Sequence, residues 1–229
     1  LYASLSKINT EDKNIVTIED PVEFVIPRIR QTQVNPKAGI TFASGLRGFL
    51  RQDPDIMMVG EIRDRETVEI SIQAALTGHL VFSTLHTNDA SAALTRLVDI
   101  GVEPFLISSS VIGILAQRLV RLNCTKCQES YAPSVAVLES VGLPPHSKLT
   151  RGRGCSRCNQ TGFMGRTGIY ELMTITDEIK TMVDERRSSS EIRKKALEQG
   201  LKSLRQDGLE KVTRGLTTLE EVLRVTEIE

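Results

Sequence analysis

The sequence predicts an α/β fold in which a parallel β-sheet is covered by helices. Between residues 14 and 120, short runs rich in β-branched residues alternate with longer segments of helical periodicity. Each short apolar run also ends in polar residues, as a buried strand does where it enters a loop. The length of 229 residues allows one large core and a small additional module.

Three buried strands and three helices are expected in this region. The strands are predicted over residues 14–20 (NIVTIED), 55–60 (DIMMVG) and 79–86 (HLVFSTLH). The helices are predicted after Thr41, which can act as an N-cap, and over residues 66–77 and 90–99. Ligands of such sheets bind beyond the carboxyl ends of the strands, so the polar residues at the three strand ends form one candidate site.

The character of the sequence changes after Arg121, where cysteines, glycines and short polar runs begin, and helical periodicity returns near Asp177. Two pairs of residues have the spacing of capping boxes, Ser188 with Glu191 and Thr217 with Glu220. The last part of the chain is therefore predicted to form two or three small helices.

The composition argues against a dedicated nucleic-acid-binding protein. The 29 basic and 29 acidic residues cancel, so no overall field attracts nucleic acid or an anionic membrane surface. Aromatic residues make up 4% of the chain, too few for extended base-stacking surfaces. The most apolar stretch, residues 104–117, is shorter than the roughly 17 to 25 residues of a transmembrane helix. The opening residues show no secretion signal.

The four cysteines predict a structural zinc site. Cys124 and Cys127 form one C-x2-C pair, Cys155 and Cys158 form a second, and 27 residues separate the two pairs. Two such turns supply the four thiolates of a tetrahedral zinc site, which has no open position for catalysis. The zinc is therefore expected to fold this part of the chain.

Two other interpretations of the cysteines are weaker. Two disulfides fit poorly with a chain that shows no secretion signal, because the cytosol keeps thiols reduced. A redox role lacks the preceding strand of a thioredoxin-like motif. Gly162, Gly165 and Gly168 are interpreted as turn residues of the same module rather than as a phosphate-binding loop.

A cluster of carboxylates stands at the end of the first predicted strand. The segment TIEDPVE places Glu19 and Asp20 at the strand end and Glu23 just beyond, and Pro21 stops any helix there. Such carboxylates can hold magnesium-bound water or orient an attacking water in phosphoryl transfer. The alternative is a loop whose acidic residues only cap neighbouring elements.

The second predicted strand, in DPDIMMVGEIRD, brings Glu61 to the same edge, where the Walker B acid of an ATPase stands. Gly60 occupies the position at which many such motifs have Asp. Glu61 would then activate water, or serve the magnesium shell, without the usual acidic neighbour. The alternative is a buried strand that ends in a capped turn.

Two histidines lie at opposite ends of the third predicted strand. His79 and His86 are seven residues apart. In an extended strand this separation is about 23 Å, so the two rings cannot share one metal ion. His86 stands at the carboxyl end and is placed to sense a γ-phosphate, whereas His79 is expected to be structural.

Together and in order, these segments resemble the secretion-superfamily ATPases, which include the type II secretion ATPases and the type IV pilus assembly ATPases. TIEDPVE is similar to the family's Asp box, IMMVGEIRD to its Walker B motif and GHLVFSTLHTNDA to its His box. The four-cysteine segment resembles the arm of the extension motors, which the retraction ATPases lack. The resemblance implies a RecA-like core over residues 1–121, a zinc module over 122–172 and a C-terminal helical subdomain over 173–229.

The resemblance also implies roles for the candidate site residues. Glu61 would be the catalytic glutamate, with His86 near the γ-phosphate of ATP. The cluster Glu19, Asp20 and Glu23 would organise magnesium and water.

Four arginines match arginines that the family needs for activity: Arg47, Arg51, Arg63 and Arg96. Guanidinium groups suit this chemistry, because they neutralise phosphate charge and can reach across a subunit interface. Arg51 could instead only pair with Asp53 or Asp55.

One family motif, the phosphate-binding loop G-x-x-x-x-G-K-[ST], has no match in the sequence. In the family the segment LYASL directly follows that loop, so we expect a C-terminal part of a longer ATPase that is inactive alone. The resemblance implies a homo-oligomeric, hexameric ring in the cytoplasm, held at the inner membrane by platform proteins of a secretion or pilus system. The segment EPFLISSSVIGILAQRLVR favours the secretion branch over pilus assembly. A zinc-bearing assembly or docking module is the non-enzymatic alternative.

Overall fold

The computed structural model describes residues 1–226 and divides into two compact units. Unit 1 comprises residues 1–87, 91–112 and 175–192. Unit 2 comprises residues 88–90, 113–174 and the chain from residue 193 onward. The chain therefore passes between the units several times, and each unit has a core of its own.

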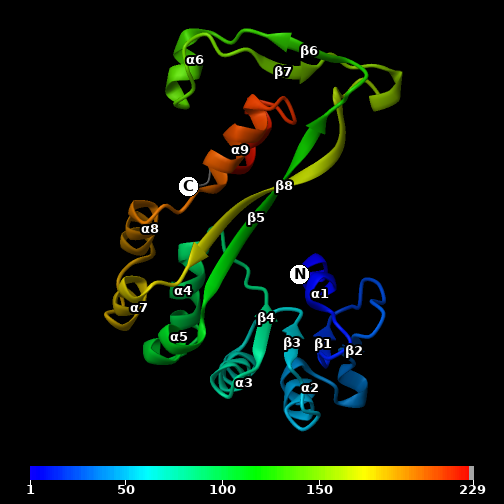
Figure 1. Cartoon of the computed structure of the whole chain (residues 1–229), viewed down its shortest axis with the longest axis vertical. Helices are drawn as coiled ribbons and strands as arrows, with labels where there is room; N and C mark the ends of the chain where they lie inside the picture. The colour runs from blue at the N-terminus through cyan, green and yellow to red at the C-terminus, as the bar shows by residue number, and fades with distance from the viewer. Residues whose placement is uncertain (227–229) are drawn as a thin grey trace. The chain divides into compact units, whose positions relative to one another are not determined.

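Unit 1 is built on a parallel sheet of four strands in the order β2-β1-β3-β4 (Figure 1). The strands are β1 (Ile15–Glu19), β2 (Arg30–Gln33), β3 (Ile56–Val59) and β4 (Leu80–Ser83). The three predicted strands are confirmed, although each is shorter at both ends than predicted. The edge strand β2 was not predicted, because its sequence RQTQ contains no apolar run.

The two faces of this sheet bury different apolar side chains. One face packs against α2 and α3 through Val16, Ile18, Met57 and Val59. The other face packs against Leu5 of α1 (Tyr2–Ile8) and against the loop after β1, through Ile15, Ile56 and Met58. Because side chains alternate along a strand, Thr17 and Glu19 lie on the face covered by α1.

The three predicted helices of this region are confirmed as α2 (Phe42–Phe49), α3 (Arg65–Leu76) and α4 (Ala90–Asp99). Thr41 caps α2 in a reciprocal capping box with Ser44. Asp64 caps α3, so this helix begins one residue earlier than predicted. A 3-10 turn η1 (Pro36–Ala38) and the helices α5 (Pro104–Ser110) and α7 (Asp177–Asp184) complete unit 1.

The apolar stretch 104–117 does not form a single element. Helix α5 ends at Ser110, and strand β5 (Gly113–Asn123) begins three residues later. Over residues 1–226, no helix is both long enough and apolar enough to cross a membrane.

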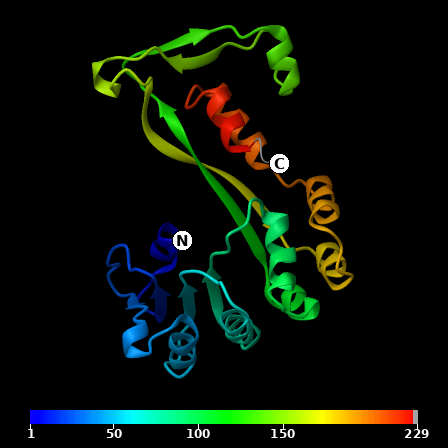
Figure 2. The ribbon, with the colours of Figure 1, turned by 180° about the vertical axis from the view of Figure 1, so that it is seen from behind.

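Unit 2 contains a long two-stranded ribbon, in which β5 pairs antiparallel with β8 (Phe163–Thr174) (Figure 2). Between these strands in the sequence lie a second antiparallel pair, β6 (Gln128–Tyr131) and β7 (Leu149–Gly152), the helix α6 (Val135–Ser140) and the 3-10 turn η2 (Ser156–Cys158). The C-terminal helices are α8 (Ser189–Glu198), α9 (Leu204–Thr213) and α10 (Leu219–Thr226). The core of the unit joins the ribbon to α9 and α10 through Val120, Ile169, Val212 and Val222.

The ribbon corrects one prediction about the glycines. Gly162 and Gly165 have φ angles of 75° and 81°, as turn residues do. Gly168 instead lies within β8, where a Cβ would come within 2.4 Å of the Tyr170 ring. The prediction that Gly168 is a turn residue is therefore wrong, because the need for glycine there comes from close packing inside a strand.

The predicted capping boxes of the C-terminal helices are half correct. Ser188 and Glu191 cap α8 reciprocally, as predicted. The cap of α10 lies one residue later than predicted, because Thr218 accepts the hydrogen bond of the Glu221 amide. The hydroxyl of Thr217 instead donates to the carbonyl of Arg121.

The predicted three-part division remains a prediction. Strand β5 runs through the boundary expected after residue 121, and β8 runs through the one expected after residue 172.

Glu221 fastens α10 to the ribbon of unit 2. Its carboxylate is 2% exposed and accepts hydrogen bonds from the amide and guanidinium of Arg121, at 3.0 and 2.6 Å. Arg224 adds two bonds from within α10, at 3.0 and 3.1 Å. The bond from the Arg121 guanidinium, helped by Arg224, outweighs burial and lowers the pKa of Glu221 from 4.5 to about 2.

We expect Glu221→Gln to lower the free energy of unfolding by about 2 kcal/mol at neutral pH. This is less than the loss expected when a fully buried ion pair is broken, because solvent screens the two half-exposed arginines. Since the folded-state pKa is depressed, the stabilisation is present above pH 4.5 and is lost as the pH falls toward 2. Urea unfolding at several pH values should show the gap between parent and variant shrinking below pH 4.5. Glu220→Gln, at an exposed position of the same helix, is the control. A gap that does not depend on pH would contradict the prediction.

Candidate functional site

The carboxyl ends of the sheet strands in unit 1 surround a hollow of about 360 Å³. It is lined by residues from α1, from the loop after β1, and from the ends of β3 and β4. The polar and charged lining residues are Tyr2, Glu19, Asp20, Glu23, Glu61, Arg63, Thr84 and His86. The sheet therefore brings together the three predicted strand-end segments at one site.

Glu61 follows β3 and lies largely enclosed at the wall of the hollow. Its side chain is 13% exposed, and each of its two oxygens has a cationic or imidazole partner. Arg63 Nη2 lies 2.5 Å from Oε1, and His86 Nε2 lies 2.9 Å from Oε2. The predicted meeting of the Walker B-like strand and the His86 segment is thus present as a direct contact.

The contacts of Glu61 stabilise its ionised form. The hydrogen bond from Arg63 is the largest effect on the pKa of Glu61 and lowers it. Burial acts in the opposite direction, and the His86 bond lowers the pKa further, so that the pKa lies below its ordinary value. In this state Glu61 is a hydrogen-bond acceptor and a weak base.

Close packing against the neighbouring strand explains why a glycine, Gly60, precedes Glu61. A Cβ at Gly60 would stand 3.3 Å from Glu19 Cα and 3.3 Å from the carbonyl of Ile18, both on the neighbouring strand. The Gly60 amide also donates to the Ile18 carbonyl at 2.8 Å, and the Thr84 hydroxyl donates to the Gly60 carbonyl at 2.7 Å. The chain therefore crosses the sheet edge in close contact with both neighbours, and Glu61 leaves it in a fixed direction.

The three carboxylates of the loop after β1 have different environments. Asp20 and Glu23 are exposed and line the hollow. Glu19 is 3% exposed, and its oxygens accept hydrogen bonds from Thr17, Gln31 and the Tyr2 hydroxyl. The sequence indicated the carboxylates but not these partners.

Tyr2 shows the effect of its buried acidic neighbour. Burial, reinforced by the bond to Glu19, raises the pKa of the Tyr2 hydroxyl, so that it stays protonated and donates.

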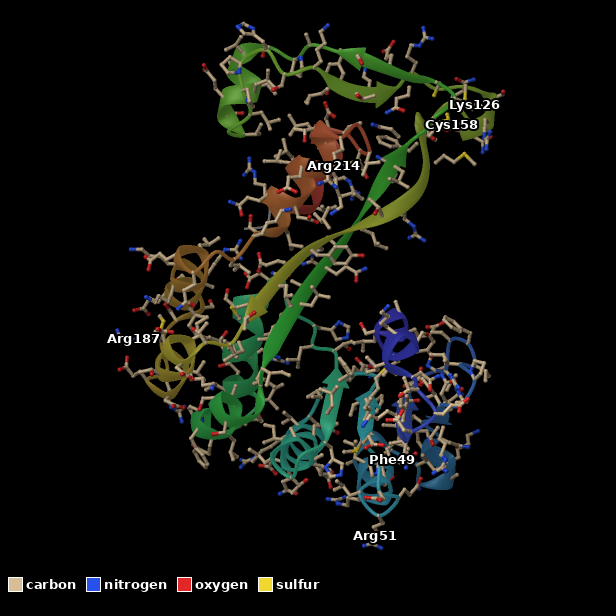
Figure 3. The ribbon with its side chains drawn as sticks, in the orientation of Figure 1. Phe49, Arg51, Lys126, Cys158, Arg187 and Arg214 are labelled. Atoms are coloured by element: carbon tan, nitrogen blue, oxygen red, sulfur yellow. The ribbon has the colours of Figure 1, made fainter. Side chains whose placement is uncertain are left out.

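Of the four predicted arginines, the structure brings only Arg63 to the hollow. Arg47 on α2 pairs with Glu66 at 2.5 Å. Arg51 is exposed just past the end of α2, away from the carboxyl ends of the strands (Figure 3), and pairs with neither Asp53 nor Asp55.

Arg96 is exposed on α4 and is not a lining residue of the hollow. In this structure Arg47, Arg51 and Arg96 therefore lie outside the site that contains Glu61.

His79 lies outside the hollow, as expected for a structural residue. Its Nδ1 is 2.9 Å from the carbonyl of Ala74 and 3.1 Å from the hydroxyl of Thr77, at the end of α3. Strand β4 ends at Ser83, so His86 stands in the following loop rather than on the strand.

The residues around the hollow fit a magnesium nucleotide by their chemistry. The exposed oxygens of Asp20 and Glu23 are the hard ligands that magnesium and its bound water prefer. The guanidinium of Arg63 and the ring of His86 can contact phosphate oxygens. The volume also lies within the usual range of ligand sites.

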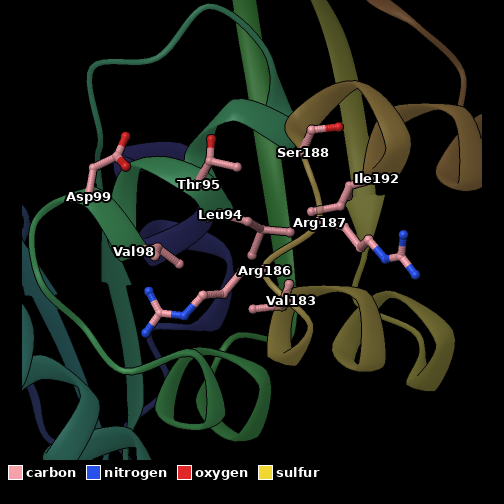
Figure 4. Close-up of a pocket in the computed structure, with 9 residues that line it drawn as sticks. All are labelled: Leu94, Thr95, Val98, Asp99, Val183, Arg186, Arg187, Ser188 and Ile192. Carbon is pink, nitrogen blue, oxygen red and sulfur yellow. The ribbon is translucent and has the colours of Figure 1, made fainter.

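A second, smaller hollow in unit 1 lies between α4 and the α7–α8 segment (Figure 4). It measures about 170 Å³ and has apolar walls formed by Leu94, Val98, Val183 and Ile192. The nearby Arg187 is engaged with Glu185 and Glu191. No residue predicted for the site lines this hollow.

The four cysteines of unit 2 converge at one end of the β5–β8 ribbon, where Figure 3 labels Cys158. Their sulfur atoms all lie within 4.8 Å of one another. The shorter separations are 3.7 Å for Cys155–Cys158, 3.8 Å for Cys127–Cys158 and 3.9 Å for Cys124–Cys155. Sulfurs at the corners of a tetrahedron with Zn–S bonds of about 2.3 Å are about 3.8 Å apart, so the cluster fits zinc.

The same distances exclude disulfides between these cysteines in the structure, since a disulfide requires about 2.05 Å. Burial raises the pKa of Cys158, but the amides of Cys155 and Gly162, which donate to its sulfur, outweigh burial and lower the pKa to about 6. Burial raises the pKa of Cys127 to about 11. The backbone thus already favours one thiolate in the cluster.

A family model described as "Type II/IV secretion system protein" matches residues 1–224 of the chain. The chain therefore belongs to the family of type II/IV secretion system proteins.

Curated relatives from both branches of the family have nearly equal identity to the chain. It is 55% identical to Type II secretion system protein E of Pseudomonas aeruginosa over 99% of its length, and 54% identical to Type IV pilus assembly ATPase PilB of Thermus thermophilus over 98%. It is 52% identical to Type II secretion system ATPase E of Vibrio cholerae over 99%. The chain spans 45% of the Pseudomonas and Vibrio proteins and 26% of the Thermus protein.

Solved structures confirm the fold. The pilus retraction motor PilT with bound ADP has a TM-score of 0.69 and 29% identity, over 98% of this chain and 55% of that one. The ATPase DotB of Yersinia pseudotuberculosis has a TM-score of 0.72 at 23% identity, over 98% of this chain and 53% of that one, and supports the fold alone. The predicted α/β class with a helix-covered parallel sheet is confirmed.

We expect Arg63→Ala to raise the pKa of Glu61 toward its ordinary value, because the strongest stabilisation of the ionised carboxylate is removed. A carbon-detected NMR titration of the Glu61 carboxyl would measure the change. Arg47→Ala removes another exposed guanidinium, which pairs with Glu66 instead, and should leave the pKa of Glu61 as in the parent. An unchanged titration in Arg63→Ala would contradict the role given to Arg63.

Proposed function

We propose that this chain forms part of a motor ATPase that hydrolyses ATP to drive pseudopilus assembly and protein export by type II secretion. The observation that carries the proposal is Glu61, held between Arg63 and His86 at the carboxyl edge of a parallel sheet. Enclosed carboxylates at this edge serve phosphoryl transfer in nucleotide-hydrolysing enzymes, where they orient the attacking water. The relatives extend well beyond the matched part, and we propose that the remainder supplies the phosphate-binding loop.

The role of Glu61 follows from its place at the wall of the hollow, where both of its oxygens accept hydrogen bonds. A carboxylate that stays ionised accepts a hydrogen bond from water and holds that water for attack, rather than storing a proton. Bound magnesium ATP would supply the phosphoanhydride bond to be cleaved. Arg63 and His86, which are exposed on their outer sides, can turn from Glu61 toward phosphate oxygens.

The other predicted residues receive more distant roles. Asp20 and Glu23 would hold magnesium-bound water from their exposed positions, and Glu19 would support them from its buried one. Three exposed arginines, which lie on α2, just past its end and on α4, would act on the nucleotide of a neighbouring subunit: Arg47, Arg51 and Arg96. This role fits a homo-oligomeric ring, which we propose to be a hexamer in the cytoplasm, held at the inner membrane by platform proteins.

We further propose that Cys124, Cys127, Cys155 and Cys158 bind one structural zinc ion. The tetrahedral spacing of the sulfurs and the amide donors around Cys158 support this assignment. The ion would fix the turn that closes the ribbon of unit 2, and it would take no part in hydrolysis.

A second candidate function is pilus assembly. The 54% identity to the Thermus pilus ATPase, beside 55% to the Pseudomonas secretion protein, favours it almost as much. A third, a zinc-bearing assembly module without hydrolysis, is favoured by the cysteine cluster alone. ATP turnover by the chain, compared with an extended protein that includes the phosphate-binding loop, separates the enzymatic candidates from the third. If neither the chain nor the extended protein hydrolyses ATP at concentrations where rings form, the third function, a zinc-bearing assembly module, is supported.

In the extended protein, Glu61→Gln should lower the rate of ATP hydrolysis by about 100-fold or more, because the amide cannot hold the attacking water as a carboxylate does. ATP affinity should change less than about threefold, since nucleotide binding depends on other contacts. Steady-state hydrolysis and binding of a fluorescent nucleotide would measure the two effects. Glu69→Gln, which removes a carboxylate that pairs with Arg65, is the control. Unchanged ATP turnover in Glu61→Gln would contradict the catalytic role proposed for Glu61.

The purified chain should contain about one zinc ion, and Cys158→Ser should lose it, because three thiolates hold zinc much less tightly than four. Elemental analysis of the metal content would measure this. Ser156→Ala, in the same turn but at an exposed non-ligand position, should retain the metal. Full zinc content in Cys158→Ser would refute the four-thiolate site.

A further inference from the structure

Residues 20–26, the first part of the loop between β1 and β2, are called here the acidic loop. Gln31 of β2 stands opposite Thr17 of β1 and supports the backbone of this loop at two points. Its Oε1 accepts a hydrogen bond from the Ile26 amide at 2.7 Å, and its Nε2 donates to the Phe24 carbonyl at 3.1 Å. The side-chain amide of Gln31 thus satisfies one backbone N–H and one backbone carbonyl of the acidic loop, as the backbone of a neighbouring strand would.

The same amide also contacts the buried carboxylate at the end of β1. Gln31 Nε2 lies 3.1 Å from Glu19 Oε1 and 3.4 Å from the Tyr2 hydroxyl. Thr17 donates to the same Glu19 oxygen at 2.5 Å, and the Tyr2 hydroxyl donates to the other oxygen. Glu19 is 3% exposed, so these donors replace the water molecules that would otherwise hydrogen-bond to its oxygens.

Tyr2 fixes the other part of the acidic loop. Its ring packs edge to face against Phe24, with centroids 4.5 Å apart. Its hydroxyl accepts a hydrogen bond from the Glu23 amide at 3.1 Å while it donates to Glu19. A single hydroxyl therefore joins the buried carboxylate to the backbone that carries Glu23.

We propose that Gln31 and Tyr2 are positioning residues that hold the acidic loop so that Asp20 and Glu23 face the hollow containing Glu61. The inference rests on the proposed function, because it assigns the two side chains a part in ATP hydrolysis. They act through Glu19 and through the loop backbone, not on the reacting groups. Glu19 accordingly serves as the buried anchor of the network.

Gln31→Glu tests the proposal with little change in size. The variant keeps an acceptor for the Ile26 amide, loses both N–H donors and places a second carboxylate against Glu19. In the extended protein it should lower kcat by about tenfold or more, whereas KM for ATP should change less than about threefold. Gln73→Glu makes the same exchange at an exposed position of α3 that does not line the hollow, and should keep kcat within about twofold.

Tyr2→Phe is the second variant, for the case that Gln31→Glu fails to fold. It keeps the ring against Phe24 and removes only the hydroxyl. Amide hydrogen exchange at Glu23, which needs no nucleotide, should become faster, and kcat should fall while KM for ATP is retained. Faster exchange with the kcat of the parent would overturn the positioning role.

The two proposals fail in distinguishable ways. If Glu61→Gln leaves turnover unchanged, the proposed function fails whatever the Gln31 and Tyr2 variants do. If Glu61→Gln abolishes turnover while folded Gln31→Glu and Tyr2→Phe keep the kcat of the parent, only the positioning proposal fails.

Discussion

The parallel pairing of β1, β3 and β4 is the constraint on which the rest of unit 1 depends. Because the three strands run in the same direction, their carboxyl ends reach one edge of the sheet in register, with Ile18 opposite Val59 and Val59 opposite Ser83. The segments that follow are therefore neighbours although they are far apart in sequence. The close crossing at Gly60 then fixes the direction in which Glu61 leaves the sheet.

Unit 2 solves a different physical problem. A two-stranded ribbon exposes much of its surface and is marginal alone, so its stability must come from what packs on it and from what closes its ends. Helices α9 and α10 cover one face, and Glu221 fastens α10 to β5. At the cysteine end, the Cys124 amide donates to the Gly162 carbonyl at 2.8 Å and extends the pairing to the cysteine cluster. A zinc ion there would close the ribbon at the point where backbone pairing ends.

Much of the sheet could be predicted from the sequence, because β1, β3 and β4 are apolar runs with polar ends. The edge strand β2 could not, since an exposed four-residue strand needs no apolar pattern. The spacing of the cysteines predicted a cluster because a C-x2-C turn constrains its own geometry. For the site, chain order indicated Glu61 and His86, but the contacts of Gln31 with Glu19 depend on register between strands, which no local pattern encodes. Arg47 and Arg51 were predicted as site residues from the resemblance alone, and the single chain does not bring them to the hollow.

The two glutamates at the edge, Glu19 and Glu61, have different kinds of partners. Glu19 is buried and accepts hydrogen bonds from neutral donors of the fold itself, so the loss of a partner would leave a buried polar group unsatisfied. The partners of Glu61 are side chains that are 67% and 82% exposed, Arg63 and His86, and exposed partners move at little cost. Of the two, Glu61 is thus the carboxylate that can exchange a protein partner for a ligand or water. The sheet edge therefore combines Glu19, whose partners are fixed by the fold, with Glu61, whose exposed partners can be replaced by a ligand or water.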